Sequence, residues 1–219
     1  MAPATAAAQA SLTVDPVQPC YRELSTVFLR ASGFSPATPV VFTRDSNPVG
    51  SPIVTDGSGA LLARLTLPGL VSGQRRLTYV ATDSTNPALT ASASLLVTAT
   101  DVGMRPRRGA PHRLLTIRAR GFFKDERGRG SNTLWAHILR VGRPARTARN
   151  LRIGRVQGPC RRVIAKRRLF PRDVAPGKYR VQFDTFRRYR PNRVVQTRFD
   201  VTLFRTAGTA RVSAVSPAS

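Results

Sequence analysis

Apolar and polar residues alternate along much of the second half of the chain. In residues 179–184 the odd positions are apolar or aromatic and the even positions are polar, and a similar alternation runs from Val195 to Leu203. A period of two with one apolar face is typical of an antiparallel β-strand that is buried on one side. Apolar residues never follow helical spacing over more than two turns. The pattern therefore predicts an all-β protein.

Short segments of this kind recur about seven times in each half, separated by turns rich in Gly, Pro, Asn and Asp. The strands expected in the first half are residues 11–15, 24–31, 39–44, 51–55, 60–67, 74–82 and 89–98. Those expected in the second half are residues 101–105, 113–120, 133–141, 146–153, 162–169, 178–185 and 193–204.

The two halves also share an internal repeat. Residues 73–98 and 177–202 each begin at a turn Gly, run as a strand, break at a loop with Asn and Pro, and return as a strand. Residues 29–34 and 117–122 match as well, and both end in Gly-Phe. Gly33 and Gly121 are 88 residues apart, whereas Gly73 and Gly177 are 104 residues apart, so the second copy holds about 16 additional residues between these glycines. Self-similarity at a fixed period indicates repeated structural modules.

Three short motifs resemble those of the tandem immunoglobulin-like modules of bacterial surface and secreted proteins. They are the Gly-Phe pairs, the Asp56–Gly59 turn and the Pro-to-Gly entry to the sixth strand. The second module, with residues 134–137 and 158–160, also resembles secreted actinobacterial proteins. The resemblance implies two tandem immunoglobulin-like β-sandwich domains of about seven strands each and a role at the cell surface. It brings no functional residues with it.

On this basis we divide the chain into a near-neutral domain at residues 11–100 and a strongly basic domain at residues 101–205, followed by a disordered tail at 206–219. Residues 1–10 end in Ala8-Gln9-Ala10, which matches the end of a signal peptide. We therefore expect an exported protein whose start codon is misassigned or whose signal peptide is truncated; the alternative is an ordinary disordered Ala-rich end. No segment approaches the ~20 apolar residues of a membrane span.

The net charge is +25, and it lies in the second half. Residues 1–101 carry six basic and six acidic side chains, whereas residues 102–219 carry thirty and five. This asymmetry predicts an anionic partner: a cell-wall polymer or polysaccharide, a membrane surface, or nucleic acid. The alternative is codon bias, because only three of the basic residues are Lys.

Three loops of the second domain, together with its last hairpin, hold the residues that we expect to bind an anion. Arg groups among aromatic residues bind phosphate, sulfate or carboxylate and stack on rings. The predicted set is Lys124, Arg127, Arg129, Arg155, Arg161, Arg162, Arg180, Arg187, Arg188, Tyr189, Arg190, Arg193 and Arg198. Arg180 and Arg198 are expected to lie opposite each other, an unfavourable pair unless an anion lies between them. Nucleic acid is the alternative partner, although no groove-binding helix is predicted.

The chain has two cysteines, Cys20 and Cys160, one in each half. Sandwich topology places them on loops that would face each other in an end-to-end pair of domains, so we expect an inter-domain disulfide, which suits an oxidising compartment. Two free buried thiols and intermolecular pairing are the alternatives.

Catalysis is not predicted. No nucleophile elbow, zinc-protease motif or phosphate loop is present, and no pair of carboxylates has glycosidase-like spacing. We interpret His137 as a packed or solvated strand residue and expect no cofactor and no metal. Ser58 belongs to a turn between strands.

Overall fold

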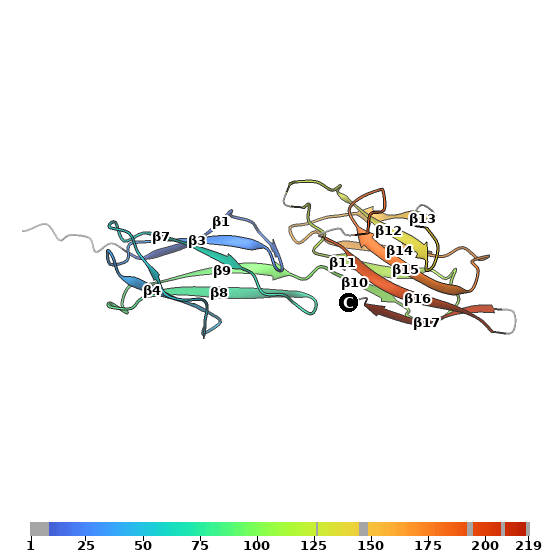
Figure 1. Cartoon of the computed structure of the whole chain (residues 1–219), viewed down its shortest axis with the longest axis horizontal. Coiled ribbons are helices and arrows are strands. Elements are labelled where there is room, and N and C mark those ends of the chain that lie inside the picture. The colour runs from blue at the N-terminus through green and yellow to red at the C-terminus, as the bar shows by residue number, and fades with distance from the viewer. Residues whose placement is uncertain (1–8, 126, 145–148, 192–194, 207–208, 218–219) are drawn as a thin grey trace, which may run out of the picture. The chain divides into compact units, whose positions relative to one another are not determined.

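The computed structural model describes residues 9–125, 127–144, 149–191, 195–206 and 209–217. Every regular element in these residues is a β-strand (Figure 1), so the prediction of an all-β fold is confirmed. Contacts divide the chain into two compact units, residues 1–98 and 99–219. Each unit is described by itself below.

Unit 1 is a β-sandwich of two sheets. Its strands are β1 (Ser11–Asp15), β2 (Tyr21–Arg22), β3 (Thr26–Ser32), β4 (Pro39–Arg44), β5 (Asn47–Pro48), β6 (Ile53–Val54), β7 (Leu61–Thr66), β8 (Gln74–Asp83) and β9 (Thr90–Thr98). One sheet has the order β1-β3-β7, and the other has the order β2-β9-β8-β4-β5 with β6 beside β4. The predicted segments recover the longer strands, and β2 and β5 are additional two-residue strands.

Unit 2 repeats this plan. Its strands are β10 (Asp101–Arg105), β11 (Leu115–Arg120), β12 (Thr133–Arg140), β13 (Arg149–Arg155), β14 (Val163–Arg167), β15 (Gly177–Asp184), β16 (Thr197–Thr206) and β17 (Thr209–Pro217). The sheets have the orders β10-β11-β14 and β13-β12-β15-β16-β17. In both units the first strand pairs with β3 or β11, which pairs in turn with β7 or β14. In the other sheet, the first strand of the hairpin β8–β9 or β15–β16 lies beside β4 or β12. This is the arrangement of an immunoglobulin-like sandwich.

Each unit has its own apolar core, built from the inward-facing residues of both sheets. Leu77, Tyr79 and Ala81 of β8 are buried in unit 1. Val181 and Phe183 of β15 are buried in unit 2. Period-two alternation therefore placed the core side of β15 correctly.

The Gly-Phe pairs after β3 and β11 occupy equivalent positions. Gly33 and Gly121 have φ angles of 78° and 76°, and the following Phe34 and Phe122 are buried. A Cβ on Gly121 would lie 2.2 Å from the carbonyl oxygen of Ala99. A left-handed backbone that meets another segment this closely admits only glycine. The same local requirement thus explains the repeated motif in both units.

The predicted disordered tail requires a correction. Residues 209–217 form β17, which pairs antiparallel with β16, with Val201 opposite Val215 and Leu203 opposite Val212. Without β17, the free edge of β16 would expose a row of unpaired N–H and C=O groups. Backbone pairing at this edge is not visible in the small-residue composition on which the prediction rested.

Candidate functional site

Three loops of unit 2 meet at one end of its sandwich; their described residues there are 121–125 with 127–132, 156–162 and 185–191. The Nε of Arg161 donates a hydrogen bond to the carbonyl of Phe122 at 3.3 Å. The hydroxyl of Ser131 donates to the carbonyl of Thr185 at 2.7 Å. These bonds join the three loops that carry most of the predicted anion-binding residues.

Several predicted anion-binding residues already have partners. Arg129 forms a salt bridge with Asp125 at 2.8 Å. Arg161 is half-buried and donates to two backbone carbonyls, and its burial lowers its pKa. Tyr189 packs edge-on against the ring of His137, with centroids 5.8 Å apart. These contacts hold the loops together and leave these groups less available to a ligand.

The expected pairing of Arg180 with Arg198 is wrong. In the register of β15 and β16, Arg180 lies opposite Asp200, and the two side chains form a salt bridge at 3.0 Å. Arg198 lies opposite Gln182, and its Nε donates to the amide oxygen at 3.3 Å. The hairpin register is offset by two residues from the expected one, so each Arg faces an acceptor.

Seven predicted residues remain exposed and form no salt bridge within the described part of the chain. They are Lys124, Arg127, Arg155, Arg162, Arg187, Arg188 and Arg190. The remaining predicted residue, Arg193, lies outside the described residues.

A second cationic surface, not predicted from the sequence, covers the outer side of the sheet β10-β11-β14. We call it the basic sheet face and define it by Arg105, Thr116, Arg118 and Lys166. Arg105 and Lys166 flank Thr116 in one row of the register, and Arg118 lies in the next row. All three cations are exposed, because their neighbours along each strand point into the core.

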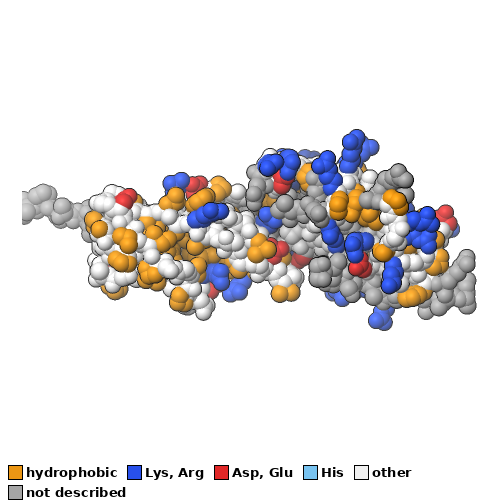
Figure 2. Space-filling view, viewed as in Figure 1, with side chains coloured by type: hydrophobic (Ala, Val, Ile, Leu, Met, Phe, Trp, Pro, Cys, Tyr) orange, Lys and Arg blue, Asp and Glu red, His pale blue; other side chains and the backbone are white. Residues whose placement is uncertain are grey.

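A shallow hollow of about 660 Å³ adjoins this face and is lined by Arg105, Pro106, Arg107, Arg113 and Thr116. The alternation of Arg with apolar residues in 117–120 is a sequence signal for an outward cationic row. The sequence does not show that the cations of β10, β11 and β14 are neighbours, since β14 follows β11 by more than forty residues. On the side drawn in Figure 2, Lys and Arg side chains gather over unit 2.

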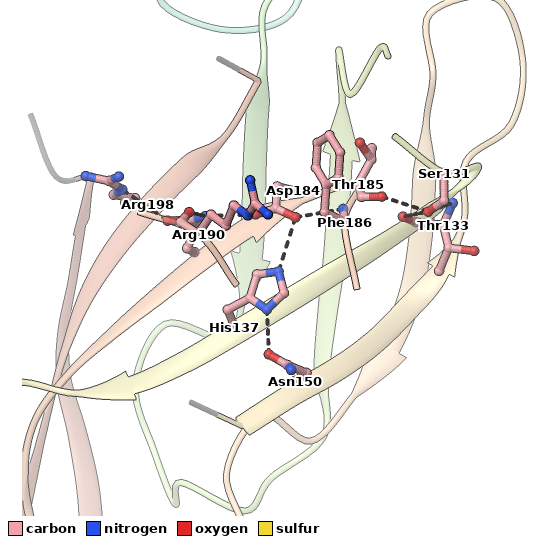
Figure 3. Close-up of polar contacts among 10 residues, drawn as sticks. Ser131, Thr133, His137, Asn150, Asp184, Thr185, Phe186, Arg190 and Arg198 are labelled. Atoms are coloured by element: carbon pink, nitrogen blue, oxygen red, sulfur yellow. Dashed lines mark hydrogen bonds and ion pairs between the residues drawn. The ribbon is translucent and has the colours of Figure 1, made fainter. Parts of the chain in front are cut away.

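His137 belongs to a buried polar cluster on the other sheet of unit 2 (Figure 3). It lies on β12, on the face opposite the core, and its side chain is fully buried. Its Nδ1 lies 2.6 Å from Oδ1 of Asn150, and its Nε2 lies 3.1 Å from Oδ1 of Asp184. Asp184 also accepts hydrogen bonds from the side-chain amide of Gln182 and from the backbone N–H of Phe186.

This cluster changes the prediction for β15. Gln182 and Asp184 were expected to face solvent, yet both are fully buried. The chain after β15 lies against the outer side of the sheet: Tyr189 packs on His137, and the carbonyl of Arg190 accepts a hydrogen bond from Gln182. A loop that covers the polar side of a strand is a tertiary effect that alternation does not encode.

The protonation of His137 follows from its partners. Burial lowers the pKa of His137, but the hydrogen bonds to Asp184 and Asn150 raise it by more, so the pKa lies above its ordinary value of 6.5. Both ring nitrogens face oxygen atoms, which suits an imidazolium that donates to both. The cluster joins β12, β13, the end of β15 and the chain after it, which is a structural role.

Both cysteines are disulfide-bonded, and neither is a free thiol. Cys20 and Cys160 are 1% and 3% exposed. The expectation that both cysteines are oxidised is therefore confirmed, and the alternative of two free thiols is excluded. Their pairing with each other stays a prediction. Within the described residues, no cluster of three or more His, Cys, Asp or Glu side chains is placed to hold a metal ion, and no helix is long and apolar enough to cross a membrane.

No protein-family model matches the chain, and no curated protein matches its sequence. Among solved structures, the human OSCAR ligand-binding domain aligns over 96% of this chain and 98% of its own, with 14% sequence identity and a TM-score of 0.31.

Proposed function

We propose that this protein is an exported, non-catalytic interaction protein whose second unit binds an anionic polymer of the cell surface, such as an acidic polysaccharide. The immunoglobulin-like sandwich is a common scaffold for interaction modules, although the fold alone names no ligand. A disulfide suits an oxidising compartment outside the cytoplasm, which supports export.

The proposal rests mainly on the small number of carboxylates in unit 2 and on their pairing with cationic side chains of the same unit. This unit has thirty Lys and Arg residues and six Asp and Glu residues. Four of the carboxylates are paired: Asp101 with Arg120, Asp125 with Arg129, Asp184 with His137 and Asp200 with Arg180. Asp173 is exposed, and Glu126 lies outside the described residues. Internal pairing therefore leaves most of the positive charge without a counterion.

The basic sheet face is the part of this surface best suited to a polymer. Neighbouring strands lie about 4.8 Å apart, so Arg105 and Lys166, two strands apart, present charges roughly 10 Å from each other across a rigid sheet. Thr116, which is half-buried, lies between them in the register. Charges held on strands are positioned more firmly than charges on loops, and a polymer can contact several at once.

The test compares two triple variants of the full chain. One removes three charges from the basic sheet face: Arg105→Gln, Arg118→Gln and Lys166→Gln. The control removes three exposed charges elsewhere in unit 2: Arg168→Gln, Arg172→Gln and Lys178→Gln. Binding to a polyuronate is measured at physiological salt, with double-stranded DNA and a neutral polysaccharide as competitors.

We expect the first variant to lose on the order of tenfold in polyuronate affinity, the control to lose much less, and the salt dependence of the first to become shallower. Equal losses would indicate a diffuse polycation without a binding face. Preference for DNA at physiological salt would instead favour the nucleic-acid alternative. Cell fractionation, with the N-terminus of the native protein read, tests export separately.

A further inference from the structure

A pocket of about 320 Å³ opens at one end of the unit 2 sandwich. Ile138 of β12 and Tyr179 of β15 line it from the sheet, and the connection between β14 and β15 contributes four further apolar side chains. The described residues that line it are Ile138, Arg140, Arg143, Arg149, Leu169, Phe170, Pro171, Val174 and Tyr179. This volume is at the small end of the range for ligand pockets, and an apolar interior with a few polar groups is their usual composition.

The floor of the pocket is fixed by packing. Phe170 and Tyr179 meet edge-to-face, with ring centroids 5.3 Å apart and an interplanar angle of 69°. The hydroxyl of Tyr179 donates a hydrogen bond to the carbonyl of Ala175 at 2.7 Å, which holds the connection against the sheet. Leu169 and Phe170 are nearly inaccessible to solvent. A ligand would therefore meet a preformed apolar floor and lose little affinity to ordering it.

The rim of the pocket is cationic. Arg140 is partly engaged, since its Nη2 donates to the carbonyl of Pro176 at 3.1 Å. Arg143 and Arg149 are exposed, and neither forms a salt bridge within the described residues. No carboxylate is among the described residues that line the pocket. An apolar floor beneath two available guanidinium groups matches a molecule with an apolar body and one anionic end.

We propose that this pocket binds a small amphipathic anion, such as a medium-chain carboxylate. Its carboxylate bonds to Arg143 and Arg149, and its hydrocarbon part lies against Pro171 and Val174, which are the more exposed apolar side chains of the lining. This site is separate from the basic sheet face, and it uses apolar burial in addition to charge, so it stands independently of the proposed polymer binding.

The experiment measures binding of octanoate to the full chain by calorimetry and by NMR shifts, with octanol as the neutral probe of the same length. The double variant Arg143→Gln with Arg149→Gln removes the rim charges. The matched control, Arg168→Gln with Arg172→Gln, removes two charges that do not line the pocket. Val174→Trp fills the pocket without changing the charge, and thermal unfolding checks that each variant is folded.

We expect octanoate to bind more tightly than octanol, and the rim variant to lose on the order of tenfold or more in octanoate affinity while the control stays within about twofold. The filled variant should lose binding of both probes. Three results would each overturn the proposal: no octanoate binding to the native chain, equal affinity for octanol, or an equal loss in the control. The triple variant of the basic sheet face should lose polyuronate binding and keep octanoate binding, which distinguishes the polymer site from the pocket.

Discussion

The Nε2 of His137 lies 3.1 Å from Oδ1 of Asp184, and both side chains are fully inaccessible to solvent. A buried ion pair stabilises a protein only when its remaining hydrogen-bonding groups are satisfied. Here Asn150 contacts the other ring nitrogen, and Gln182 and Phe186 donate to the carboxylate. The cluster is therefore complete, and removing one member leaves the others unpaired.

Replacement of Asp184 tests this dependence. Asp184→Asn keeps the shape of the side chain but removes the negative charge that faces the imidazolium, so we expect a loss of about 3 kcal/mol in the free energy of unfolding of unit 2. The control, Asp200→Asn, breaks the exposed pair with Arg180 and should cost less than about 1 kcal/mol. Urea unfolding of the full chain, followed by NMR signals of each unit, measures both. Similar costs would contradict a buried pair.

Stability should also depend on pH through His137. Its pKa is raised, so the folded state holds the proton more tightly than the unfolded chain does. The resulting stabilisation is fully present below about pH 6.5 and is lost as the pH rises through the folded-state pKa. We expect unit 2 to become less stable over this window above pH 6.5. His137→Gln should remove that slope, whereas His112→Gln should retain it; a slope that persists in His137→Gln assigns the effect to another group.

Alternation in the sequence predicted the strands and core faces because burial on one side of a strand is a local property of period two. It could not predict that Gln182 and Asp184 are buried, because their cover comes from Tyr189 and the backbone of Arg190, several residues beyond the strand. The partner of Arg180 was mispredicted for a related reason. The loop between β15 and β16 sets the hairpin register, and its conformation does not follow from the pattern of the two strands.

The candidate sites likewise divide into residues that local sequence predicts and residues that only tertiary structure brings together. Loop residues such as Arg187 and Arg188 were predicted because the chain between two strands of a hairpin is usually exposed. The basic sheet face was missed because Arg105, Arg118 and Lys166 become neighbours only through pairing across three strands. Its charges are scattered in the sequence, whereas those of the loops are consecutive.

Gly121 offers a test of the repeated Gly-Phe motif. Gly121→Ala forces a Cβ into a left-handed backbone and to 2.2 Å from the carbonyl oxygen of Ala99. Gly128 has a similar φ of 70°, but a Cβ there meets nothing within 4 Å. We therefore expect Gly128→Ala to cost about 1–2 kcal/mol from backbone strain alone and Gly121→Ala to cost clearly more. Thermal unfolding of both variants separates the two effects, and equal costs would show that the contact with Ala99 relaxes freely.

The disulfide state of Cys20 and Cys160 leads to a prediction of connectivity. Both are bonded, and we predict that they pair with each other within one chain. Peptide mapping of the full chain without reduction should yield one linked pair of peptides containing the two residues, at the mass of a monomer. Such a bond closes a loop of more than 100 residues, which on the chain-entropy model stabilises the folded chain by roughly 4–5 kcal/mol. The double variant Cys20→Ser with Cys160→Ser should therefore unfold at a lower temperature than the oxidised protein and match the native chain measured in reductant. A covalent dimer in non-reducing gels, or an unchanged unfolding temperature, would contradict the pairing.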